Sequence, residues 1–563
     1  MMTFEELKEE NRELKGKKLN PEWVNTIAWQ QIKYKYLASG ETCVKDMFTR
    51  VANSASKMLP ESQVNKYNDI FFNLLWNNWL VGSTPVLSNM GTNRGLNVSC
   101  SGNYVEDSVY GFYNSYLEEA MLSKHGFGTS SYLGAIRPRG SKISTGGIAS
   151  GILPVFKMCV NTARDITQGG QRRGAWAGYI PIDHNDFWEV SHWVFDNQED
   201  VNVGWIVSNN FIDRLNSGDE DAIARYQWTM KIKCIWGKGY FFFVDKVNAL
   251  KPPTIKNKIH ASNLCTEIML PSSPTETFTC VLSSMNIARY DEWKTEDAVY
   301  NSTIFLDCVA EYFIKEAENY TKMENSINFT KKYRALGLGQ LGFHSYLQDN
   351  MIPFESLEAQ YRNMEIAKHI WEKSLLASQD MAKEYGEPEA CKGFGVRNAT
   401  RIAIAPNFSS SLGAGGVSQG IEPWAMVAFN QDLSCGDVKR IVPTFLKLAK
   451  ARGKYSEVMI QDIIENQVGS VRNLKWLTEH EKLVFKTAFE IDQKVIIRLA
   501  SQRQKYIDQA QSINLFFSAD EKEDYISEVH QLAFMDPNIK SLYYLRSEKG
   551  VQASKSGCIS CES

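Results

Sequence analysis

The chain has 563 residues, of which 43% are hydrophobic and 23% charged, and its formal net charge is −3. This length allows large hydrophobic cores, while the near-neutral charge excludes the basic footprint of a dedicated nucleic-acid binder. The charged N-terminal stretch MMTFEELKEENRELKGKK is no signal peptide, and the longest uncharged run, 402–421, is too rich in Gly and Ser to span a membrane.

The number and spacing of the cysteines indicate the cellular compartment of the protein. There are eleven cysteines, an odd number spread widely along the chain, which argues against a secreted disulfide framework. We therefore expect a cytoplasmic protein, in the host cytoplasm if the chain is viral. In a reducing compartment a Cys-x-x-Cys pair, such as Cys558 and Cys561 in the terminal KSGCISCES, indicates redox chemistry or metal binding.

The predicted elements change character along the chain. Up to about residue 80, apolar residues in NTIAWQQIKYKYLA and YNDIFFNLLWNNWLVG recur with helical spacing. From Ser83 onward, short apolar runs such as GYFFFVDKV and RIAIAP alternate with helical patterns such as TIFLDCVAEYFIKEAE. This alternation predicts an α/β body. The residues after SLYYLR have the composition of a disordered tail.

Two familiar motifs are weak here. GLGQLG, Gly337 to Gly342, matches the dinucleotide fingerprint, but the preceding FTKKYRAL is polar, so we predict a tightly packed helix start instead. Only Glu189 and His192 have carboxylate–histidine spacing, and a zinc ribbon needs a second Cys-x-x-Cys. We therefore predict no metal in this chain.

The stretch ASNLCTEIMLPSS is the most informative one. Asn263, Cys265 and Glu267 alternate, so in an extended segment their side chains would leave the same face, about 6–7 Å apart. A thiol, a carboxylate base and an amide could then surround one small substrate. A mixed polar strand with a structural cysteine is the alternative. Cys100 and Cys280 could likewise be small buried hydrophobes.

Together with the adjacent Tyr543 and Tyr544, these residues resemble the large (α) subunit of class I ribonucleotide reductase, from GSTPVLSNMG to the last cysteine. The resemblance implies a ten-stranded α/β barrel with Cys265 on a loop inside it. We expect a mainly helical region at 1–97, the barrel at 98–545 and a flexible redox tail at 546–563. The implied activity is reduction of ribonucleotides, as diphosphates, to deoxyribonucleotides.

The resemblance also implies roles for the catalytic residues. Cys265 would carry a thiyl radical, Glu267 would be the general base, and Asn263 would orient the sugar hydroxyls. Cys100 and Cys280 would supply the electrons and end as a disulfide. Tyr543 and Tyr544 would relay the radical, and Cys558 and Cys561 would restore the dithiol.

The resemblance implies that further residues bind nucleotides. Those at the substrate are Ser83, Thr84, Ser99, Asn407, Ser409, Ser410 and Ser411; those of the effector and specificity sites are Asp107, Ser108, Arg137, Gln168 and Arg172.

Partners and rivals follow from the same resemblance. The chain itself would hold no cofactor, because a metal-containing small (β) subunit would supply the radical. Thioredoxin or glutaredoxin would be the reductant, and deoxynucleoside triphosphates and ATP would be effectors of a homodimer. The sequence shows no ATP-cone segment before residue 80, so overall-activity control is expected to be absent. Asn407 departs from the Thr or Ser usual in the family.

Three alternative functions remain open. They are a cobalamin-dependent class II reductase, which the tyrosine pair disfavours, a flavin or NAD thiol–disulfide oxidoreductase, and a non-enzymatic nucleotide-binding regulator.

Overall fold

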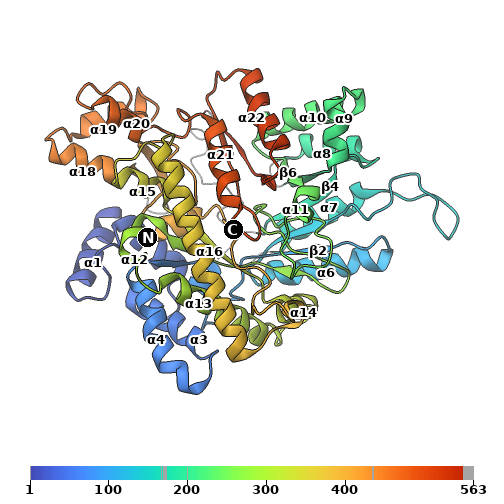
Figure 1. Cartoon of the computed structure of the whole chain (residues 1–563), viewed down its shortest axis with the longest axis horizontal. Helices are drawn as coiled ribbons and strands as arrows, with labels where there is room; N and C mark the ends of the chain where they lie inside the picture. Colours follow the sequence, from blue (N-terminus) through green and yellow to red (C-terminus); the bar gives the residue numbers. More distant parts are fainter. Residues whose placement is uncertain (1, 167, 169–173, 199–200, 434–435, 549–563) are drawn as a thin grey trace.

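The N-terminal region of the computed structural model is helical. Residues 2–166, 168, 174–198, 201–433 and 436–548 are described. The first four helices, at the lower left of Figure 1, are α1 (Phe4–Gly16), α2 (Thr26–Gln31), α3 (Val44–Ser56) and α4 (Glu61–Trp76). A π-helical turn at Ile32–Tyr36 follows α2. α1 begins at a capping box, in which Thr3 and Glu6 satisfy each other's backbone N–H groups. The helical periodicity of this region is confirmed.

A seven-stranded sheet forms the larger part of the body, in the order β13-β6-β5-β4-β3-β2-β7. Its strands are β2 (Cys100–Tyr104), β3 (Gly128–Tyr132), β4 (Trp176–Pro181), β5 (Asn202–Val207), β6 (Tyr240–Phe243), β7 (Phe278–Thr279) and β13 (Ser541–Leu542). Strands β2 to β6 are parallel, and the connecting helices are α6 (Val109–Lys124), α7 (Ile152–Asp165), α8 (Phe187–Asp196), α9 (Asn209–Asn216) and α10 (Glu220–Trp236). Crossover helices between parallel strands bury both faces of the sheet. A hairpin around Lys142 and Ile148 projects from the body between β3 and α7 (Figure 1).

A second sheet has the order β1-β8-β9, with strands β1 (Leu80–Gly82), β8 (Val281–Asn286) and β9 (Leu336–Leu341). Only Cys280 separates β7 from β8, so the chain passes from one sheet to the other at this cysteine. The helices that follow the strands of this half are α5 (Thr84–Asn89), α12 (Tyr290–Trp293), α13 (Ala298–Ala317), α14 (Glu324–Tyr333), α15 (Phe343–Asp349), α16 (Leu357–Tyr385) and α17 (Phe408–Gly413), whereas α11 (Val244–Ala249) follows β6 of the larger sheet.

Strand β9 corrects the prediction for GLGQLG. The motif is a buried strand that runs parallel to β8, and the helix α15 begins only after Gly342. A Cβ at Gly337 would lie 2.5 Å from Leu282 Cδ2, so a residue without a side chain is needed for this close pairing. The glycines therefore serve strand packing. RIAIAP also differs from a regular strand, since it contributes only the bridge between Ile404 and Gln511.

The C-terminal part completes the fold. A satellite unit with its own small core comprises β10 (Ala428–Leu433), β11 (Gly436–Ile441), α18 (Pro443–Ala451), α19 (Glu457–Glu465) and α20 (Glu479–Val484). The chain then forms α21 (Gln493–Gln504), β12 (Leu515–Phe517), α22 (Glu523–Met535) and β14 (Leu545–Ser547). β14 pairs with β12 and extends regular structure to Ser547. The expected α/β barrel with a helical N-terminal region is confirmed.

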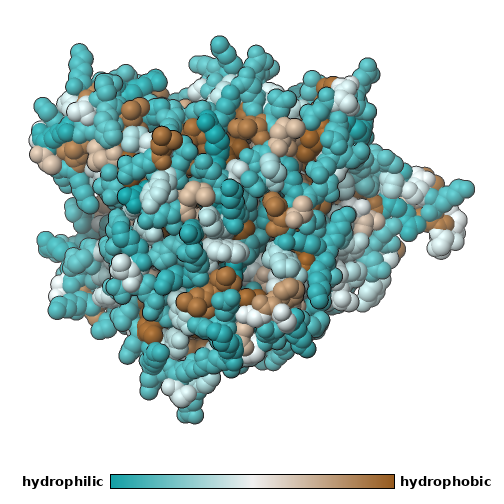
Figure 2. Space-filling view, viewed as in Figure 1, coloured by the Kyte–Doolittle hydropathy of each residue, from teal (hydrophilic) through white to brown (hydrophobic). Residues whose placement is uncertain are grey.

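The face shown in Figure 2 and the described helices can be compared with what a membrane-spanning segment requires. The face in Figure 2 is mainly hydrophilic, with apolar residues scattered over it. Within the described ranges, no helix is both long and apolar enough to cross a bilayer.

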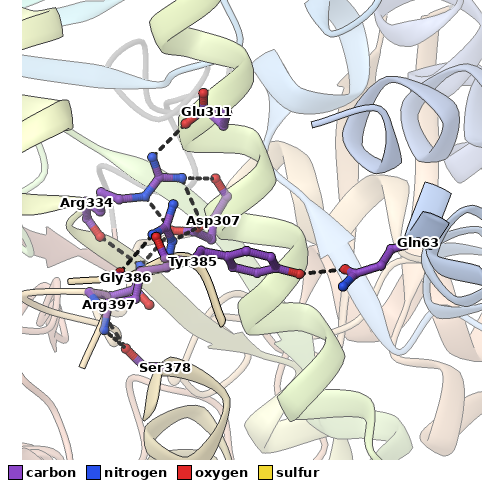
Figure 3. Close-up of polar contacts among 9 residues, drawn as sticks. Gln63, Asp307, Glu311, Arg334, Ser378, Tyr385, Gly386 and Arg397 are labelled. Atoms are coloured by element: carbon purple, nitrogen blue, oxygen red, sulfur yellow. Dashed lines mark hydrogen bonds and ion pairs between the residues drawn. The ribbon is translucent and has the colours of Figure 1, made fainter. Parts of the chain in front are cut away.

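A buried ion network ties α13 to the loop after α16 (Figure 3). Asp307 accepts hydrogen bonds from Arg334 at 2.8 Å and from Arg397 at 2.9 Å, and Arg334 also reaches Glu311 at 2.7 Å. Burial alone would raise the pKa of Asp307, but the two guanidinium groups outweigh it and lower the pKa to about 2. This carboxylate is therefore charged and fully paired.

Candidate active site

The loop that carries Cys265 is a turn beside the seven-stranded sheet, where Ser130 of β3 donates to the Ser262 carbonyl at 2.8 Å. We expected Cys265 on a loop. The loop is not the extended segment in which Asn263, Cys265 and Glu267 would share one face, because Leu264 and Cys265 are turn residues and Thr266 has a left-handed φ of 67°. Residues on other elements hold the turn: Ser541 donates to the Thr266 carbonyl at 2.8 Å, and Ala510 N–H donates to the Glu267 carbonyl at 2.9 Å. These long-range contacts stabilise a conformation that local propensity does not favour.

Asn263 and Glu267 nevertheless meet around the cysteines. The Asn263 amide donates to Cys100 Sγ at 3.3 Å and also bonds to Glu267. A Glu267 carboxylate oxygen accepts from Ser512 Oγ at 3.2 Å. Burial raises the pKa of Glu267 to about 7, against the opposing effect of a hydrogen bond from its own backbone N–H and then of those from Asn263 and Ser512. Such a carboxyl group can take up and release a proton near neutral pH.

Cys100 and Cys280 are neighbours across antiparallel strands. β2 and β7 pair Ser101 with Thr279, and the same register places Cys100 opposite Cys280, whose N–H donates to the Cys100 carbonyl at 2.8 Å. Opposed residues in such a pair have Cα atoms about 4.5–5.5 Å apart, within the range of a disulfide. Burial and then the adjacent Cys100 thiol hold the pKa of Cys280 well above its ordinary value. The Cys280 thiol is therefore protonated at neutral pH.

The tyrosine pair connects this centre to the edge of the barrel. The Tyr543 hydroxyl lies 3.5 Å from Cys265 Sγ, and the Tyr543 and Tyr544 ring centroids are 4.1 Å apart. Both rings are buried, and the Arg546 guanidinium lies 4.8 Å from the Tyr544 ring centroid. A continuous aromatic contact therefore leads from Cys265 towards the C-terminal strand.

A pocket opens beside Cys265. Cys100 and Glu267 line it, together with the predicted substrate residues Ser83, Thr84, Ser99, Asn407, Ser409 and Ser410. Ser411 does not line it, because its hydroxyl donates to the Phe408 carbonyl. The Asn407 side chain donates to the carbonyls of Gln340 and Ala405, and its φ of 60° is one that Asn tolerates better than Thr. The departure at Asn407 thus has a structural explanation.

The described residues among those predicted for the effector and specificity sites do not line this pocket. Asp107 and Arg137 make an ion pair at 2.5 Å, and Ser108 caps α6 by accepting from the Gly111 N–H. Gln168 is buried and donates to the Arg94 carbonyl at 2.8 Å. Arg172, Cys558 and Cys561 lie outside the described residues. Of the residues that are described, no group of three His, Cys, Asp or Glu is placed to hold a metal ion.

Sequence patterns missed three residues at this centre. Tyr240, in the apolar run GYFFFVDKV, donates to the Tyr544 hydroxyl at 3.1 Å. The buried Lys233 donates to the carbonyls of Tyr543 and Gly239, and burial lowers its pKa to about 7. Ser512 contacts both Cys265 and Glu267. Only tertiary contacts reveal these residues, since each lies in a stretch with no motif.

A thiol and a carboxyl group beside a dithiol, at the centre of an α/β barrel, define an oxidoreductase that works by thiol chemistry. The model of the ribonucleotide reductase barrel domain matches 98–225, 221–394 and 388–545, and that of the ribonucleotide reductase all-alpha domain matches 23–95. The chain therefore belongs to the ribonucleotide reductase family.

Individual relatives agree with this assignment. The structure of the Actinobacillus ureae class Id ribonucleotide reductase alpha subunit is similar with a TM-score of 0.85 and 37% identity, over 93% of this chain and 97% of that one. The ribonucleoside-diphosphate reductase large subunit of Invertebrate iridescent virus 3 is 28% identical over 94% of this chain and 95% of its own length. That of Danio rerio is 27% identical over 85% and 70%, respectively.

Proposed function

We propose that the chain is the catalytic α subunit of a class I ribonucleotide reductase and reduces ribonucleoside diphosphates to deoxyribonucleotides. The observation that carries the proposal is the contact of the Tyr543 hydroxyl with Cys265 Sγ, next to a buried carboxyl group and a cross-strand dithiol. This combination provides a route for a radical, a base for a proton and a source of two electrons.

In the proposed chemistry, Cys265 and Glu267 end the cycle in their starting state and only the dithiol is consumed. A Cys265 thiyl radical takes the 3′-hydrogen atom of the ribose, and Glu267 takes the 3′-hydroxyl proton. The 2′-hydroxyl leaves as water after protonation by the dithiol, for which the protonated Cys280 thiol is suited. Cys100 and Cys280 then give two electrons, pass their second proton to C2′ and form a disulfide. Glu267 returns its proton to the 3′-oxygen, and Cys265 returns the hydrogen atom to C3′. Asn263 orients the sugar hydroxyls and contacts Cys100.

The radical is proposed to come from a separate β subunit, through Tyr544 and Tyr543. Leu545 N–H donates to the Gly237 carbonyl, so the end of α10 lies beside the outer tyrosine. The last residues of that helix, Ile235 and Trp236, are exposed. Exposed apolar side chains around the outer end of the aromatic pair support docking of the partner here.

The pocket supports the proposed substrate contacts. Ser409 and Ser410 are proposed to bind the diphosphate, and Ser83, Thr84 and Ser99 to contact the nucleoside. Ser411 and Asn407 would then support the loop rather than contact the substrate, because their side chains bond to the protein. Gln168 and Arg172 are proposed to pass information about the effector towards the substrate base.

Effector binding is proposed at Asp107, Ser108 and Arg137, at the start of α6. The outer face of α6 carries Val109, Tyr113 and Leu117 at four-residue spacing, and all three are exposed. An apolar helix face of this kind supports a homodimer with the effector, a deoxynucleoside triphosphate or ATP, at its edge.

Regeneration of the dithiol is proposed to use the last cysteines. From Ser547, the end of β14, to Cys558 is eleven residues, which span at most about 40 Å. Cys558 and Cys561 would exchange with the Cys100–Cys280 disulfide and be reduced in turn by thioredoxin or glutaredoxin. Because this cycle needs a reducing compartment, the cytoplasm, or a host's cytoplasm, is the proposed location.

The decisive experiment is an activity assay of the chain with and without a candidate β subunit. Cys265→Ser should abolish deoxynucleotide formation and leave nucleotide binding nearly intact, because the substitution is roughly isosteric. Tyr543→Phe and Tyr544→Phe should also stop turnover, since Phe keeps the ring but has no phenolic proton. Turnover by the isolated chain with adenosylcobalamin, or a bound flavin spectrum, would contradict the class I assignment.

The tail has its own test. The double variant Cys558→Ser, Cys561→Ser should complete one turnover from the pre-reduced state but fail in multiple turnovers with thioredoxin. Dithiothreitol should partly restore it, because a small dithiol can enter the pocket directly. Full thioredoxin-driven turnover would show that the reductant reaches Cys100 and Cys280 by another route.

A further inference from the structure

Ser512 lies behind the Cys265 loop and contacts two of its residues. Its hydroxyl is 2.6 Å from the Cys265 carbonyl oxygen and 3.2 Å from Glu267 Oε2. Its backbone N–H donates to the Ile404 carbonyl at 2.9 Å, which fixes its position. Ser512 is buried and is not one of the residues that line the pocket, so it acts on the substrate only through the loop.

The Ser512 hydroxyl faces two acceptors but has only one proton to donate. When Glu267 is protonated, its O–H can donate to Ser512 Oγ while Ser512 donates to the Cys265 carbonyl. When Glu267 is ionised, both the carboxylate and the carbonyl need the same serine proton. The anion is the stronger acceptor, because hydrogen bonds to charged groups are about twice as strong as neutral ones.

We propose that Ser512 is a positioning residue whose hydroxyl proton moves from the Cys265 carbonyl to the Glu267 carboxylate when that base ionises. The inference rests on the proposed function, which makes Glu267 the base and Cys265 the radical residue. Ser512 would thereby favour the ionised base and link its protonation state to the backbone of the residue that carries the radical.

The surroundings of Glu267 allow a single hydroxyl donor to influence the ionisation of its carboxyl group. Among the described residues that line the pocket, Glu267 is the only one with an ionic side chain at neutral pH. The titratable groups that face this centre are the thiols Cys265, Cys100 and Cys280 and the phenols of Tyr179 on β4 and Tyr543. None of these is a cation, so the Asn263 amide and the Ser512 hydroxyl are the side chains that oppose the effect of burial on the pKa of Glu267.

Nearby, Ser541 provides a matched control. It also donates to a carbonyl of the same loop, that of Thr266 at 2.8 Å, but it forms no hydrogen bond to Glu267 among the described contacts. Removal of either hydroxyl takes one anchor from the loop. Only the removal of the Ser512 hydroxyl also takes a donor from the carboxylate, so the two variants separate loop anchoring from control of the base.

The test is an infrared titration of the Glu267 carboxyl band in the isolated chain, assigned by its loss in Glu267→Gln. Ser512→Ala should raise the Glu267 pKa by about half a unit to one unit, and Ser512→Thr, which keeps the hydroxyl, should restore it. Ser541→Ala should leave the pKa within about 0.2 unit of wild type. In the complete enzyme, the acid limb of the pH–activity profile should move upward in Ser512→Ala alone.

Two outcomes would overturn the proposal: an unchanged or lowered Glu267 pKa in Ser512→Ala, or an equal shift in Ser541→Ala. The titration needs no partner subunit and no turnover. A failed proposal about Ser512 is therefore distinguishable from a failed assignment of function, which the Cys265→Ser assay tests.

Discussion

Glu267 in the pocket and Asp307 on α13 are both withdrawn from water, with 1% and 5% of their surface exposed, yet they are held in opposite states. Asp307 has two arginines and Asn398 around it, and its pKa is lowered to about 2. Glu267 has an amide and a hydroxyl, and its pKa is raised to about 7. Burial is common to both, so the presence or absence of a cation decides the charge.

This difference distinguishes a carboxylate that stabilises the fold from a carboxyl group that is suited to proton transfer. A fully paired carboxylate fixes the position of its neighbours and has no reason to exchange a proton. A buried carboxyl group without a cation is costly when ionised, and this same property makes it a base that works near neutral pH. The molecule therefore places its ion network behind the second sheet and keeps cations out of the pocket lining.

The largest effect should come from Glu267→Gln, which removes the proposed base and keeps the shape of the side chain. Turnover should fall by about 100- to 10,000-fold, while the free energy of unfolding stays the same or rises because a buried acid is removed. Activity and denaturant unfolding on one preparation check both statements. A loss of less than about tenfold would remove Glu267 from the role of base.

Asp307→Asn should instead lower the free energy of unfolding. It leaves the partly buried Arg397 with a neutral partner and the buried Arg334 with Glu311 as its remaining carboxylate, so we expect a loss of about 3–5 kcal/mol in the free energy of unfolding. Glu311→Gln is the control: it touches Arg334 alone and is partly exposed, so it should cost less than about 1 kcal/mol. Equal losses in the two variants would show that the network does not depend on Asp307.

The pH dependence of stability should distinguish the two acids by sign. The raised Glu267 pKa favours the protonated folded state, so its contribution falls by up to about 3 kcal/mol as pH rises from about 4.5 to 7. The free energy of unfolding of Glu267→Gln should therefore rise relative to that of wild type over that range. The lowered Asp307 pKa stabilises the fold above about pH 4, and this contribution is lost as pH falls towards 2. Parallel wild-type and Glu267→Gln curves between pH 4.5 and 7 would contradict this assignment.

The smallest effect concerns the outer edge of the network. The Tyr385 hydroxyl donates to Gln63 Oε1 at 2.5 Å and links the end of α16 to α4 (Figure 3). Tyr385→Phe should cost about 0.5–1.5 kcal/mol in unfolding free energy, because one partly buried hydrogen bond is lost. A double-mutant cycle with Gln63→Ala measures the coupling, and additive losses would mean that the bond contributes nothing.

Sequence patterns predicted the α/β class, because alternation is a local property. The family resemblance pointed to Cys265, Glu267 and Tyr543, which the structure brings together. Sequence patterns failed where the chain folds back on itself. Ser512 is 245 residues from Glu267, and no local pattern connects them. The turn at Thr266 depends on Ser541, and GLGQLG forms a strand because its glycines fit against Leu282 and Ser284. Tertiary contacts override local propensity at each of these sites.

The pairing of β2 with β7 restricts insertions and deletions in these two strands. Cys100 and Cys280 face each other only because Ser101 is in register with Thr279, and side chains alternate between the two faces of a sheet. Deleting or inserting a single residue in either strand would turn one of the two thiols to the opposite face. The exposed hairpin around Lys142 and Ile148 can change in length without such a penalty. Strand length at this one point therefore determines whether the two thiols that we propose as the reductant can form a disulfide.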